Sequence, residues 1–508
     1  MILNDMTVKD LCHVALCNRS WREAANQDAL WRPLCQEKGW ERYGTVQDIC
    51  KEVPFKPTLQ EQEMGEGGAP TFPVDAVVTG SDWPQLVTTC KWKEVYMKAK
   101  HLEENWNKNR FFVATLQFGL KGIRPKKGPA YYQDYDPEEP SDLDEDEVYM
   151  SDSNEYDSDD AFARTRDKPS VCNLAGEGDS LVAGINKSTL QIWDVSHGER
   201  QHVIDAYISN RPEALKMKSG VIAAGYGDGS IRTYSAQTGE QLQVMSERHR
   251  LTVSRLFFDG DTIVSAATPE GVRYRRFSDN DIWVWNAADG ARRCILKSGS
   301  ILAGLDYKDK IIAGMYNGNL LRIWEARSGA CLHEIDSGIL VPISCHLGDG
   351  MVIGVSTDFV VKVWNLESGK CVKTFAVPID PEEQTNFALA TSCVFNGQLL
   401  VVFSNSWAVT VMDLDGERIG TFMTSNRSFM QPVCFHGNKL VTTWWSSEGS
   451  CLYGLWMVDP SKKSKGSFKI DKFTDCLMEA SHSCMLAWIS DTKLVFEQNR
   501  QIVLSHYW

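Results

Sequence analysis

The sequence predicts a mainly β protein: a β-propeller of eight four-stranded blades, preceded by a small helical module and a linker helix. Three observations predict it. The chain repeats itself from about residue 171 onward with a period of roughly 40 residues. Aromatic residues recur at matching places in the repeats, and the first 50 residues carry apolar residues at helical spacing. With 508 residues, the chain is long enough for a large repeat array and an accessory module.

Each repeat follows one plan, as in SLVAGINKSTLQIWDVSHGER and KIIAGMYNGNLLRIWEARSGAC. A β-branched strand leads to a Gly, Asp or Asn turn, then to an alternating strand that ends near an aromatic residue, then to a polar turn with Gly. The spacings between anchor residues run from 39 to 51. The anchors are Trp193, Tyr234, Trp285, Trp324, Trp364, Met412 and Trp456.

The last repeat, TKLVFEQNRQIVLSHYW, has two strands and lacks an outermost one. Upstream of the array, RFFVATLQF at 110–118 reads as a single strand without a neighbour. We expect this strand to complete the last blade, because closure removes an exposed sheet edge. Counting this way favours eight blades, and seven is the alternative if the irregular segment near 420–480 is not a blade.

These repeats resemble WD repeats over about 340 residues. Trp193–Asp194 is a literal Trp-Asp pair, and the Asp that the family places six residues before the aromatic is present as Asp228, Asp279 and Asp358. His249 matches the family's histidine in the third repeat. Its simplest interpretation is a core histidine bonded within its own blade.

The N-terminal stretch carries a helical stripe that breaks near Asn18. Asp28 is expected to cap the next helix, ALWRPLCQEK, and Gly39 to close it. A module of about 50 residues buries too little apolar surface to be stable alone, so it requires a partner. That partner is either the propeller, which makes the module a helical cap, or another protein. The stripe consists of Leu11, Val14, Ala15, Asn18, Trp21 and Ala25.

The stretch DLCHVALCNRSWREAANQDALWR resembles the second half of an F-box, and WKEVYMKAKHLEENW (92–106) resembles the linker helix of F-box/WD-repeat proteins. The match begins at Ile2–Leu3 without the family's leading Leu-Pro segment, so the resemblance is to a shortened F-box. It implies a substrate receptor of an SCF-type cullin–RING ubiquitin ligase, which docks on the Skp adaptor and holds a protein substrate on its propeller. The residues that it assigns to adaptor binding are Leu11, Val14, Trp21, Leu30 and Trp31.

The domain organisation follows from these assignments. We expect a partial F-box-like module at 1–50, a linker ending in a helix at 51–106, and a propeller at 107–508 with an acidic insertion at about 121–168. The alternative is a WD-repeat scaffold outside ubiquitin transfer, in which Leu11, Val14 and Trp21 face the propeller instead of a partner.

A basic loop region marks a candidate substrate site in the third repeat. ERHRL (247–251) precedes the repeat and TPEGVRYRRFSDND (268–281) lies inside it, and both are expected on one face of the propeller. Guanidinium groups there suit carboxylates and phosphates, so the substrate is expected to be acidic or phosphorylated. The alternative is a solvated loop whose charges pair locally with Asp279 and Asp281. The candidate residues are Arg248, Arg250, Arg273, Arg275 and Arg276.

The segment from Asp134 to Asp160 carries fourteen Asp or Glu and no Lys or Arg, which equals the net charge of −14 of the whole chain. Its composition predicts disorder, and a solubilising role is the simplest interpretation. A further hypothesis is that it folds across the basic loops and competes with acidic substrates, with Ser141 as a candidate phosphosite.

Composition excludes several classes. Outside the acidic segment the chain is neutral, which disfavours nucleic acid as a partner, and no apolar run is long enough to span a membrane. Fifteen cysteines without a Cys-x-x-Cys pair predict neither disulfides nor a metal site, and they suit the cytoplasm or nucleus. No phosphate-binding Gly loop or nucleophile motif is recognisable. A non-catalytic protein without a cofactor is therefore expected.

Overall fold

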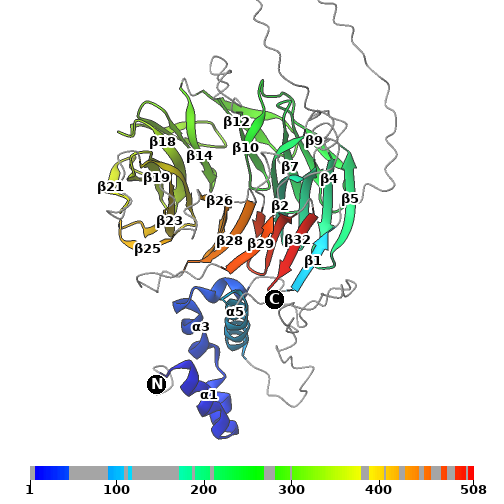
Figure 1. Ribbon diagram of the computed structural model, residues 1–508, viewed down its shortest axis with the longest axis vertical. Coiled ribbons are helices and arrows are strands. Elements are labelled where there is room, and N and C mark those ends of the chain that lie inside the picture. The colour runs from blue at the N-terminus through cyan, green and yellow to red at the C-terminus, as the bar shows by residue number, and fades with distance from the viewer. Residues whose placement is uncertain are drawn as a thin grey trace, which may run out of the picture.

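Eight four-stranded antiparallel sheets form the body of the protein, arranged around a ring in Figure 1. The computed structural model describes residues 6–44, 90–107, 112–116, 171–185, 189–205, 211–267, 281–297, 300–378, 388–405, 408–422, 430–445, 451–458, 471–476, 487–498 and 501–507. The eight-bladed propeller is confirmed. The irregular segment near 420–480 does contain a blade, so the seven-bladed alternative is wrong.

The first four blades follow one another along the chain, each with its strands in sequence order from the first to the fourth. Blade 1 is β2 (Val171–Glu177), β3 (Ser180–Ile185), β4 (Thr189–Asp194) and β5 (Glu199–Asp205); blade 2 is β6 (Pro212–Lys218), β7 (Val221–Tyr226), β8 (Ile231–Ser235) and β9 (Gln241–Val244). Blade 3 is β10 (Val253–Phe258), β11 (Thr262–Ala267), β12 (Ile282–Asn286) and β13 (Arg292–Leu296); blade 4 is β14 (Leu302–Lys308), β15 (Ile311–Tyr316), β16 (Leu320–Glu325) and β17 (Cys331–Asp336).

The remaining four blades complete the ring, and the last one takes a strand from the N-terminal part of the chain. Blade 5 is β18 (Pro342–Gly348), β19 (Met351–Ser356), β20 (Val360–Asn365) and β21 (Cys371–Ala376); blade 6 is β22 (Ala390–Phe395), β23 (Leu399–Ser404), β24 (Val409–Asp413) and β25 (Arg418–Phe422). Blade 7 is β26 (Met430–His436), β27 (Lys439–Trp445), β28 (Cys451–Met457) and β29 (Asp471–Cys476); blade 8 is β30 (Ala487–Ile489), β31 (Lys493–Gln498), β32 (Gln501–His506) and β1 (Phe112–Leu116).

The anchor residues of the repeats all lie on the third strand of their blades, opposite an aliphatic residue of the second strand. Trp285 pairs with Ile263, and Trp364 pairs with Val352. All seven anchors are buried. A large buried side chain at one fixed register position therefore fills the space between successive blades, which is why the sequence repeats there.

The ring closes through β1, which lies within the 110–118 segment. It runs antiparallel to β32, with Leu116 opposite Ile502, and becomes the outermost strand of blade 8. Leu116 is fully buried. Ring closure thus depends on a strand that follows the helical module.

The propeller has two faces, which we name from the direction of the first strands. The entry face carries the residues just before each first strand, such as Arg211, Ile301 and Val341. The exit face carries the turns between first and second strands, such as those at 308–311 and 436–439. Because every first strand runs the same way through the ring, the two sets of segments lie on opposite faces.

The helical module consists of α1 (Val8–Cys17), α2 (Arg19–Ala25), α3 (Asp28–Glu37) and the short 3-10 helix η2 (Trp40–Gly44), and it packs on α5 (Lys91–Asn107). The break between α1 and α2 lies at Asn18, whose side chain accepts a hydrogen bond from the amide of Trp21 (2.9 Å). Gly39, at φ +66°, follows α3 in the left-handed conformation that a glycine adopts readily.

The expected capping role of Asp28 is wrong. The N-cap of α3 is Gln27, without a side-chain hydrogen bond, and Asp28 is the first helical residue. The carboxylate of Asp28 accepts from the amide of Trp92 (2.9 Å), at the start of α5. It caps the neighbouring helix, a role that depends on a contact 64 residues away.

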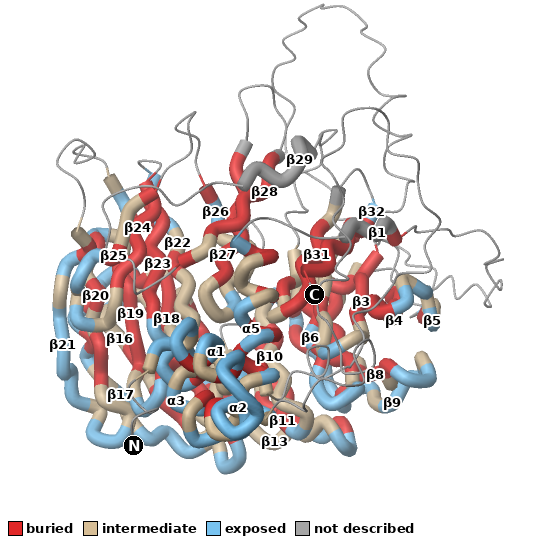
Figure 2. The backbone as a smooth tube through the Cα atoms, turned by 90° about the horizontal axis from the view of Figure 1, so that it is seen from below, coloured by how far each residue is buried: buried red, intermediate tan, exposed pale blue. Residues whose placement is uncertain are grey.

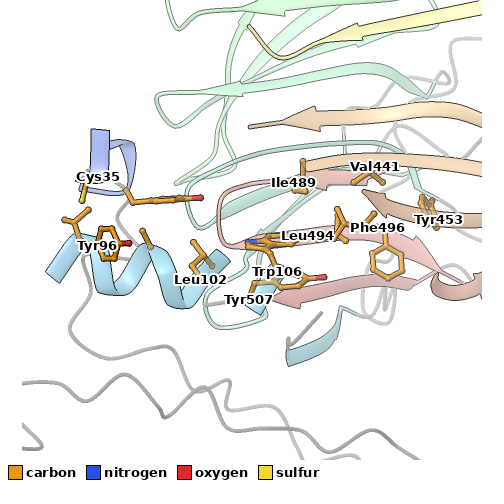
Figure 3. Close-up of a cluster of buried hydrophobic side chains, with 14 of the residues drawn as sticks. Cys35, Tyr96, Leu102, Trp106, Val441, Tyr453, Ile489, Leu494, Phe496 and Tyr507 are labelled. Carbon is orange, nitrogen blue, oxygen red and sulfur yellow. The ribbon is translucent and has the colours of Figure 1, made fainter. Parts of the chain in front are cut away.

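One buried apolar cluster continues from the module through α5 into blades 7 and 8. Figure 3 shows it running from Cys35 and Tyr96 past Trp106 to Tyr507 and Phe496. Figure 2 shows the first two helices largely exposed, while second strands of the blades such as β3, β19 and β23 are mostly buried. The module therefore shares a core with the propeller. None of the helices in the described ranges is long and apolar enough to cross a membrane.

Candidate functional site

The tip of the helical module presents apolar side chains to solvent. Helix α1 lies farther from the propeller than α3 and α5 in Figure 1. Leu16 on α1 is 75% exposed and Trp21 on α2 is 46% exposed, while Val14 and Leu30 are half-buried. A solvent-facing tryptophan and leucine on adjacent short helices form a surface suited to a protein partner.

Two of the residues assigned to adaptor binding lie inside the module instead. Leu11 and Trp31 are each 1% exposed. The indole of Trp31 donates to the carbonyl of Ala25 (2.8 Å), and its ring meets that of Tyr96 edge-on, with the centroids 5.5 Å apart. Neither side chain offers surface to a partner, so both hold the helices in place. The sequence pattern could not separate Leu11 from Trp21, because both belong to one helical stripe, whereas Trp31 lies on the next helix, α3.

Helix α5 fixes the module to the propeller. Trp106 stacks on Tyr507 with ring centroids 3.4 Å apart, and its indole donates to the carbonyl of Asp491 (2.8 Å). Asn105 donates to the carbonyl of Tyr507 (2.9 Å). Because Asp491 and Tyr507 lie at the exit-face ends of strands of blade 8, the helix is held on the exit face.

Charged groups surround this junction. The hydroxyl of Tyr43 donates to Glu103 (2.6 Å), and Glu103 lies 3.9 Å from the ammonium of Lys439, which is fully buried. Burial lowers the pKa of Lys439, while Glu103 opposes that shift. Arg42 of the module reaches Asp491 at 3.4 Å. A network that joins the module, the linker helix and two blades favours a single orientation of the module.

Burial and nearby positive charge act in opposite directions on the pKa of Asp491. Burial alone would raise the pKa of this carboxyl group, but the hydrogen bond from His436 and the positive charge of Arg42 outweigh it and lower the pKa. The carboxylate therefore stays ionised, and the contact between the module and blade 8 keeps its charge at neutral pH.

On the entry face, His249 is a core residue, as expected. It is 1% exposed, and its Nε2 lies 2.8 Å from the hydroxyl of Ser265, which also accepts a hydrogen bond from the indole of Trp285 (2.9 Å). This chain of side chains ties the loop before β10 to β11 and β12. It holds the neighbouring Arg248 and Arg250 in place, and both of these are exposed.

The rest of the basic region is only partly described. Arg273, Arg275 and Arg276 lie outside the described residues, as do Ser141 and the acidic segment. Next to Arg248, Glu247 forms an ion pair with Arg292. Local pairing thus neutralises part of the loop. Of the five candidate arginines, Arg248 and Arg250 lie within the described residues.

Two observations on the described residues concern metal binding and thiol reactivity. No group of three or more His, Cys, Asp or Glu in these ranges could hold a metal ion. Burial raises the pKa of Cys393 and of Cys434 to about 12, so these thiols stay protonated at neutral pH. Both are packed as small apolar side chains.

Sequence reasoning missed Leu16, the most exposed large apolar residue of the described chain. It lies next to the buried Ala15, and its position off the internal stripe was the available signal. Sequence reasoning also missed Asp28 as the cap of α5, for which no local signal exists.

A comparison with protein families finds a match at the N-terminus. A family model described as F-box-like matches residues 1–37. These residues include the described helix α1, helix α2 and the whole of α3. The match covers the same helices whose exposed tip is described above.

Two curated relatives resemble parts of the chain. The DENN domain and WD repeat-containing protein SCD1 of Arabidopsis thaliana is 21% identical over 225 residues, 43% of this chain and 18% of that protein. The probable E3 ubiquitin ligase complex SCF subunit sconB of Arthroderma otae is 24% identical over 125 residues, 24% of this chain and 17% of that protein. The chain thus spans less than a fifth of either relative.

Solved structures show the fold. The C-terminal WD40 domain of Sif2 superposes with a TM-score of 0.50 and 14% identity, covering 66% of this chain and 95% of that domain. The computationally designed Ika8 protein gives a TM-score of 0.51 and 18% identity, covering 67% of this chain and 96% of that protein. At these identities the likeness concerns architecture and says nothing about ligands.

Proposed function

We propose that this chain, an F-box/WD-repeat protein, is the substrate receptor of an SCF-type E3 ubiquitin ligase. Its helical module would dock on the Skp adaptor, and its propeller would hold a protein substrate. The family match at residues 1–37 and the propeller together support the proposal. The protein would carry no catalytic group of its own and would act by bringing substrate and ligase together.

One observation carries the proposal: an exposed apolar tip is joined to the propeller through a continuous buried core. Leu16 and Trp21 face solvent, while Trp106 and the residues around it fix the other end of the module to blades 7 and 8. A helical cap would turn its apolar residues toward the propeller. A rigidly mounted apolar tip suits a docking element.

The adaptor would contact the exposed and half-buried apolar residues of the first three helices. These are Leu16 and Trp21, with Val14 and Leu30 at the edge. Leu11 and Trp31 would support them from inside. The substrate would bind the entry face, where Arg248 and Arg250 suit an acidic or phosphorylated segment.

We also propose the cytoplasm or nucleus as its compartment. Eleven cysteines whose side chains the structure describes are free thiols. Several of them, such as Cys12 and Cys17, are exposed. Exposed free thiols suit a reducing environment.

The test is a binding assay of the full chain against purified Skp adaptor. Leu16→Asp and Trp21→Ala should each weaken binding at least tenfold, since they remove exposed apolar contacts without touching the buried core. The matched control is Leu332→Asp, which places the same charge at an exposed leucine on the outer strand β17 of blade 4. It should bind like the unaltered chain.

Equal binding by all three variants would mean that the tip is not the contact surface. No binding by the unaltered chain would favour the alternative, a WD-repeat scaffold outside ubiquitin transfer. Circular dichroism of each variant separates a lost contact from a lost fold.

A further inference from the structure

The exposed large apolar side chains of the described residues fall into three groups. The first lies on the module and α5, the second on outer strands of blades 2, 4 and 5, and the third on the entry face. The groups are Leu16, Trp21 and Met97; Leu242, Val244, Leu332 and Val372; and Ile301, Leu340, Val341 and Leu389.

The exposure of three residues of the second group, Leu242, Leu332 and Val372, follows from strand geometry. Trp324 pairs with Cys331 and Ile323 pairs with His333, so Leu332 between them is the extra residue of a β-bulge. Val372 is the extra residue of the corresponding bulge in β21 of blade 5. A bulge on an outer strand turns one side chain outward. It also disrupts the regular hydrogen-bonding edge, which disfavours pairing with a strand of another chain. These residues need no partner.

The third group has no such explanation, and three of its members occupy one position in successive blades. The carbonyl of Ile301 accepts from the amide of Asn317 (3.0 Å), that of Val341 from Thr357 (3.0 Å), and that of Leu389 from Asn405 (3.0 Å). Each donor directly follows the second strand of its blade. The backbone arrangement is thus the same in blades 4, 5 and 6, and each blade turns an aliphatic side chain to solvent.

The same position is not apolar everywhere. In blade 2 the equivalent carbonyl belongs to Arg211, which accepts from the amide of Gly227 (3.3 Å). The apolar character is therefore not required by the fold. We name the four residues Ile301, Leu340, Val341 and Leu389 the apolar arc; their side chains are between 47% and 68% exposed.

The arc crosses neighbouring blades, an arrangement that suits an extended polypeptide. The inner strands β14, β18 and β22 are neighbours in the ring, with Cα atoms of adjacent strands within 8 Å of each other. Figure 1 shows β14 and β18 side by side. Alternate side chains of an extended chain lie about 6.6–7 Å apart on one side. Such a chain laid across the blades would place every second side chain on the arc.

The charges on the adjoining loops indicate in which orientation a charged segment would bind. The described loop at 337–341, which carries Leu340 and Val341, has no ionisable side chain. Toward blade 3, the entry-face loops carry exposed cations, Lys297 before blade 4 and Arg248 with Arg250 before blade 3. Glu247, an exposed carboxylate beside these cations, is paired with Arg292. Near the arc itself, the ammonium of Lys362 donates to the carbonyls of Ser337 and Gly338, and Asp358 is exposed. The arc therefore has charges of both signs beside it and adjoins an excess of exposed cations over blade 3.

We propose that the apolar arc binds an extended, unphosphorylated segment of a protein partner, with aliphatic or aromatic residues at alternate positions followed by Asp or Glu. This deepens the proposed function, because the segment would be the recognition element of the ligase substrate. The binding itself requires no adaptor and can be tested separately from adaptor docking.

The experiment selects peptides on the immobilised full chain from a phage library of random twelve-residue peptides, which carry no phosphate. Enriched peptides should share two or more apolar residues at alternate positions beside acidic ones. Measured with synthetic peptides, Leu340→Asp and Leu389→Asp should each weaken binding at least tenfold, and Arg250→Ala should weaken it severalfold. Leu332→Asp, an exposed leucine on the outer edge of blade 4, should leave it unchanged.

Three results would overturn the proposal. The first is no enrichment over a bare surface, and the second is enriched peptides without the apolar pattern. The third is equal binding by Leu340→Asp and the unaltered chain. Sedimentation of the free chain tests the other occupant: a dimer that Leu340→Asp converts to monomers would assign the arc to a second copy of this chain.

The outcome is distinguishable from that of the adaptor assay. Peptide binding that Leu340→Asp abolishes, together with no adaptor binding, would support peptide binding by the apolar arc and contradict the ligase role. Adaptor binding without any selected peptide would support the ligase role and contradict peptide binding by the arc.

Discussion

Trp106 combines three contacts that together determine where the module lies. Its ring stacks on Tyr507, its indole N–H is satisfied by the carbonyl of Asp491, and the ammonium of Lys439 lies 5.0 Å from the ring centroid. Stacking and cation–π contacts gain strength where water is excluded, and Trp106 is 1% exposed. A single side chain thus couples the linker helix to both blades 7 and 8.

His506 makes ring closure sensitive to acid. It lies on β32 opposite Phe112 of the closing strand and Lys493 of β31. Burial lowers its pKa to about 3, with a further contribution from the nearby positive charge of Lys493, while Asp179 opposes the shift. The folded protein therefore holds a neutral imidazole at a position where the unfolded chain would be protonated below about pH 6.5.

Stability should fall as the pH drops below 6.5, because in that range the unfolded chain binds a proton that the folded chain does not. From this residue we expect a loss of about 1 kcal/mol between pH 7.5 and pH 5.5. The measurement is the denaturant midpoint at both pH values for the chain and for His506→Gln. The denaturant midpoint of the variant should fall less on acidification than that of the unaltered chain. It should still fall, because His346, whose pKa is also lowered by burial, is present in both proteins. An equal fall of the midpoint in the unaltered chain and in His506→Gln would contradict the role of His506.

At the scale of elements, neighbouring blades are joined by polar contacts between their exit-face turns. Lys493 pairs with Asp179 across blades 8 and 1 (3.0 Å), and Lys308 pairs with Asp349 across blades 4 and 5 (2.6 Å). Between blades 6 and 7, Asn396 donates to the carbonyl of Gly437. Apolar packing between blades is non-directional, so such contacts supply a defined register.

Asp259 is the best connected of these groups. It accepts from Lys310 (2.6 Å) and Tyr307 (2.6 Å) of blade 4, and from the amides of Asp261 and Thr262 within its own turn. Burial alone would raise its pKa, but these hydrogen bonds outweigh it and lower the pKa to about 2.

Asp259→Asn should lower the free energy of unfolding by roughly 1 kcal/mol, since it removes the nearer of the two carboxylates that Lys310 faces and keeps an oxygen for the turn. Asn396 shows that an asparagine can hold the same kind of turn, because its side chain accepts from the amides of Gln398 and Leu399. The measurement is urea unfolding. Asp349→Asn, which removes a fully solvated partner of Lys308, is the control and should cause no measurable change. Equal effects of both substitutions would show that the partly buried hydrogen bonds of Asp259 add no stability.

At the scale of the whole molecule, the closing strand links the module to the stability of the ring. Strand β1 covers the edge of β32, whose backbone groups would otherwise be free to pair with another chain. The module on the exit face and the apolar arc on the entry face then lie on opposite sides of one rigid ring. A substrate on the arc would therefore leave the adaptor surface unobstructed.

Leu116→Asp should open the ring, because it places a carboxylate at a fully buried position opposite Ile502. We expect a lower melting temperature and concentration-dependent self-association through the uncovered edge of β32. Sedimentation velocity over a range of concentrations tests this, with Gln501→Asp, an exposed substitution on β32, as the control. A variant that melts like the unaltered chain and stays monomeric would mean that β1 is dispensable for closure.

The sequence by itself determined the fold class, the blade positions and the helices. Period-2 strands, Gly-containing turns and a recurring aromatic anchor are local patterns that a strand or helix must satisfy wherever it lies. For the same reason the break at Asn18 and the core role of His249 could be predicted. The bonding partner of His249 lies only 16 residues away, within the same blade.

Only the tertiary structure decided which apolar residues face outward. Leu11 and Trp21 belong to one helical stripe, yet α3 and α5 cover the first and leave the second exposed. Asp28 caps a helix 64 residues away, and Asn105 bonds a carbonyl 402 residues away. The apolar arc likewise exists because the ring aligns Ile301, Val341 and Leu389, which are about 40 residues apart in sequence. Periodicity along a chain specifies what an element is, whereas exposure depends on which distant element covers it.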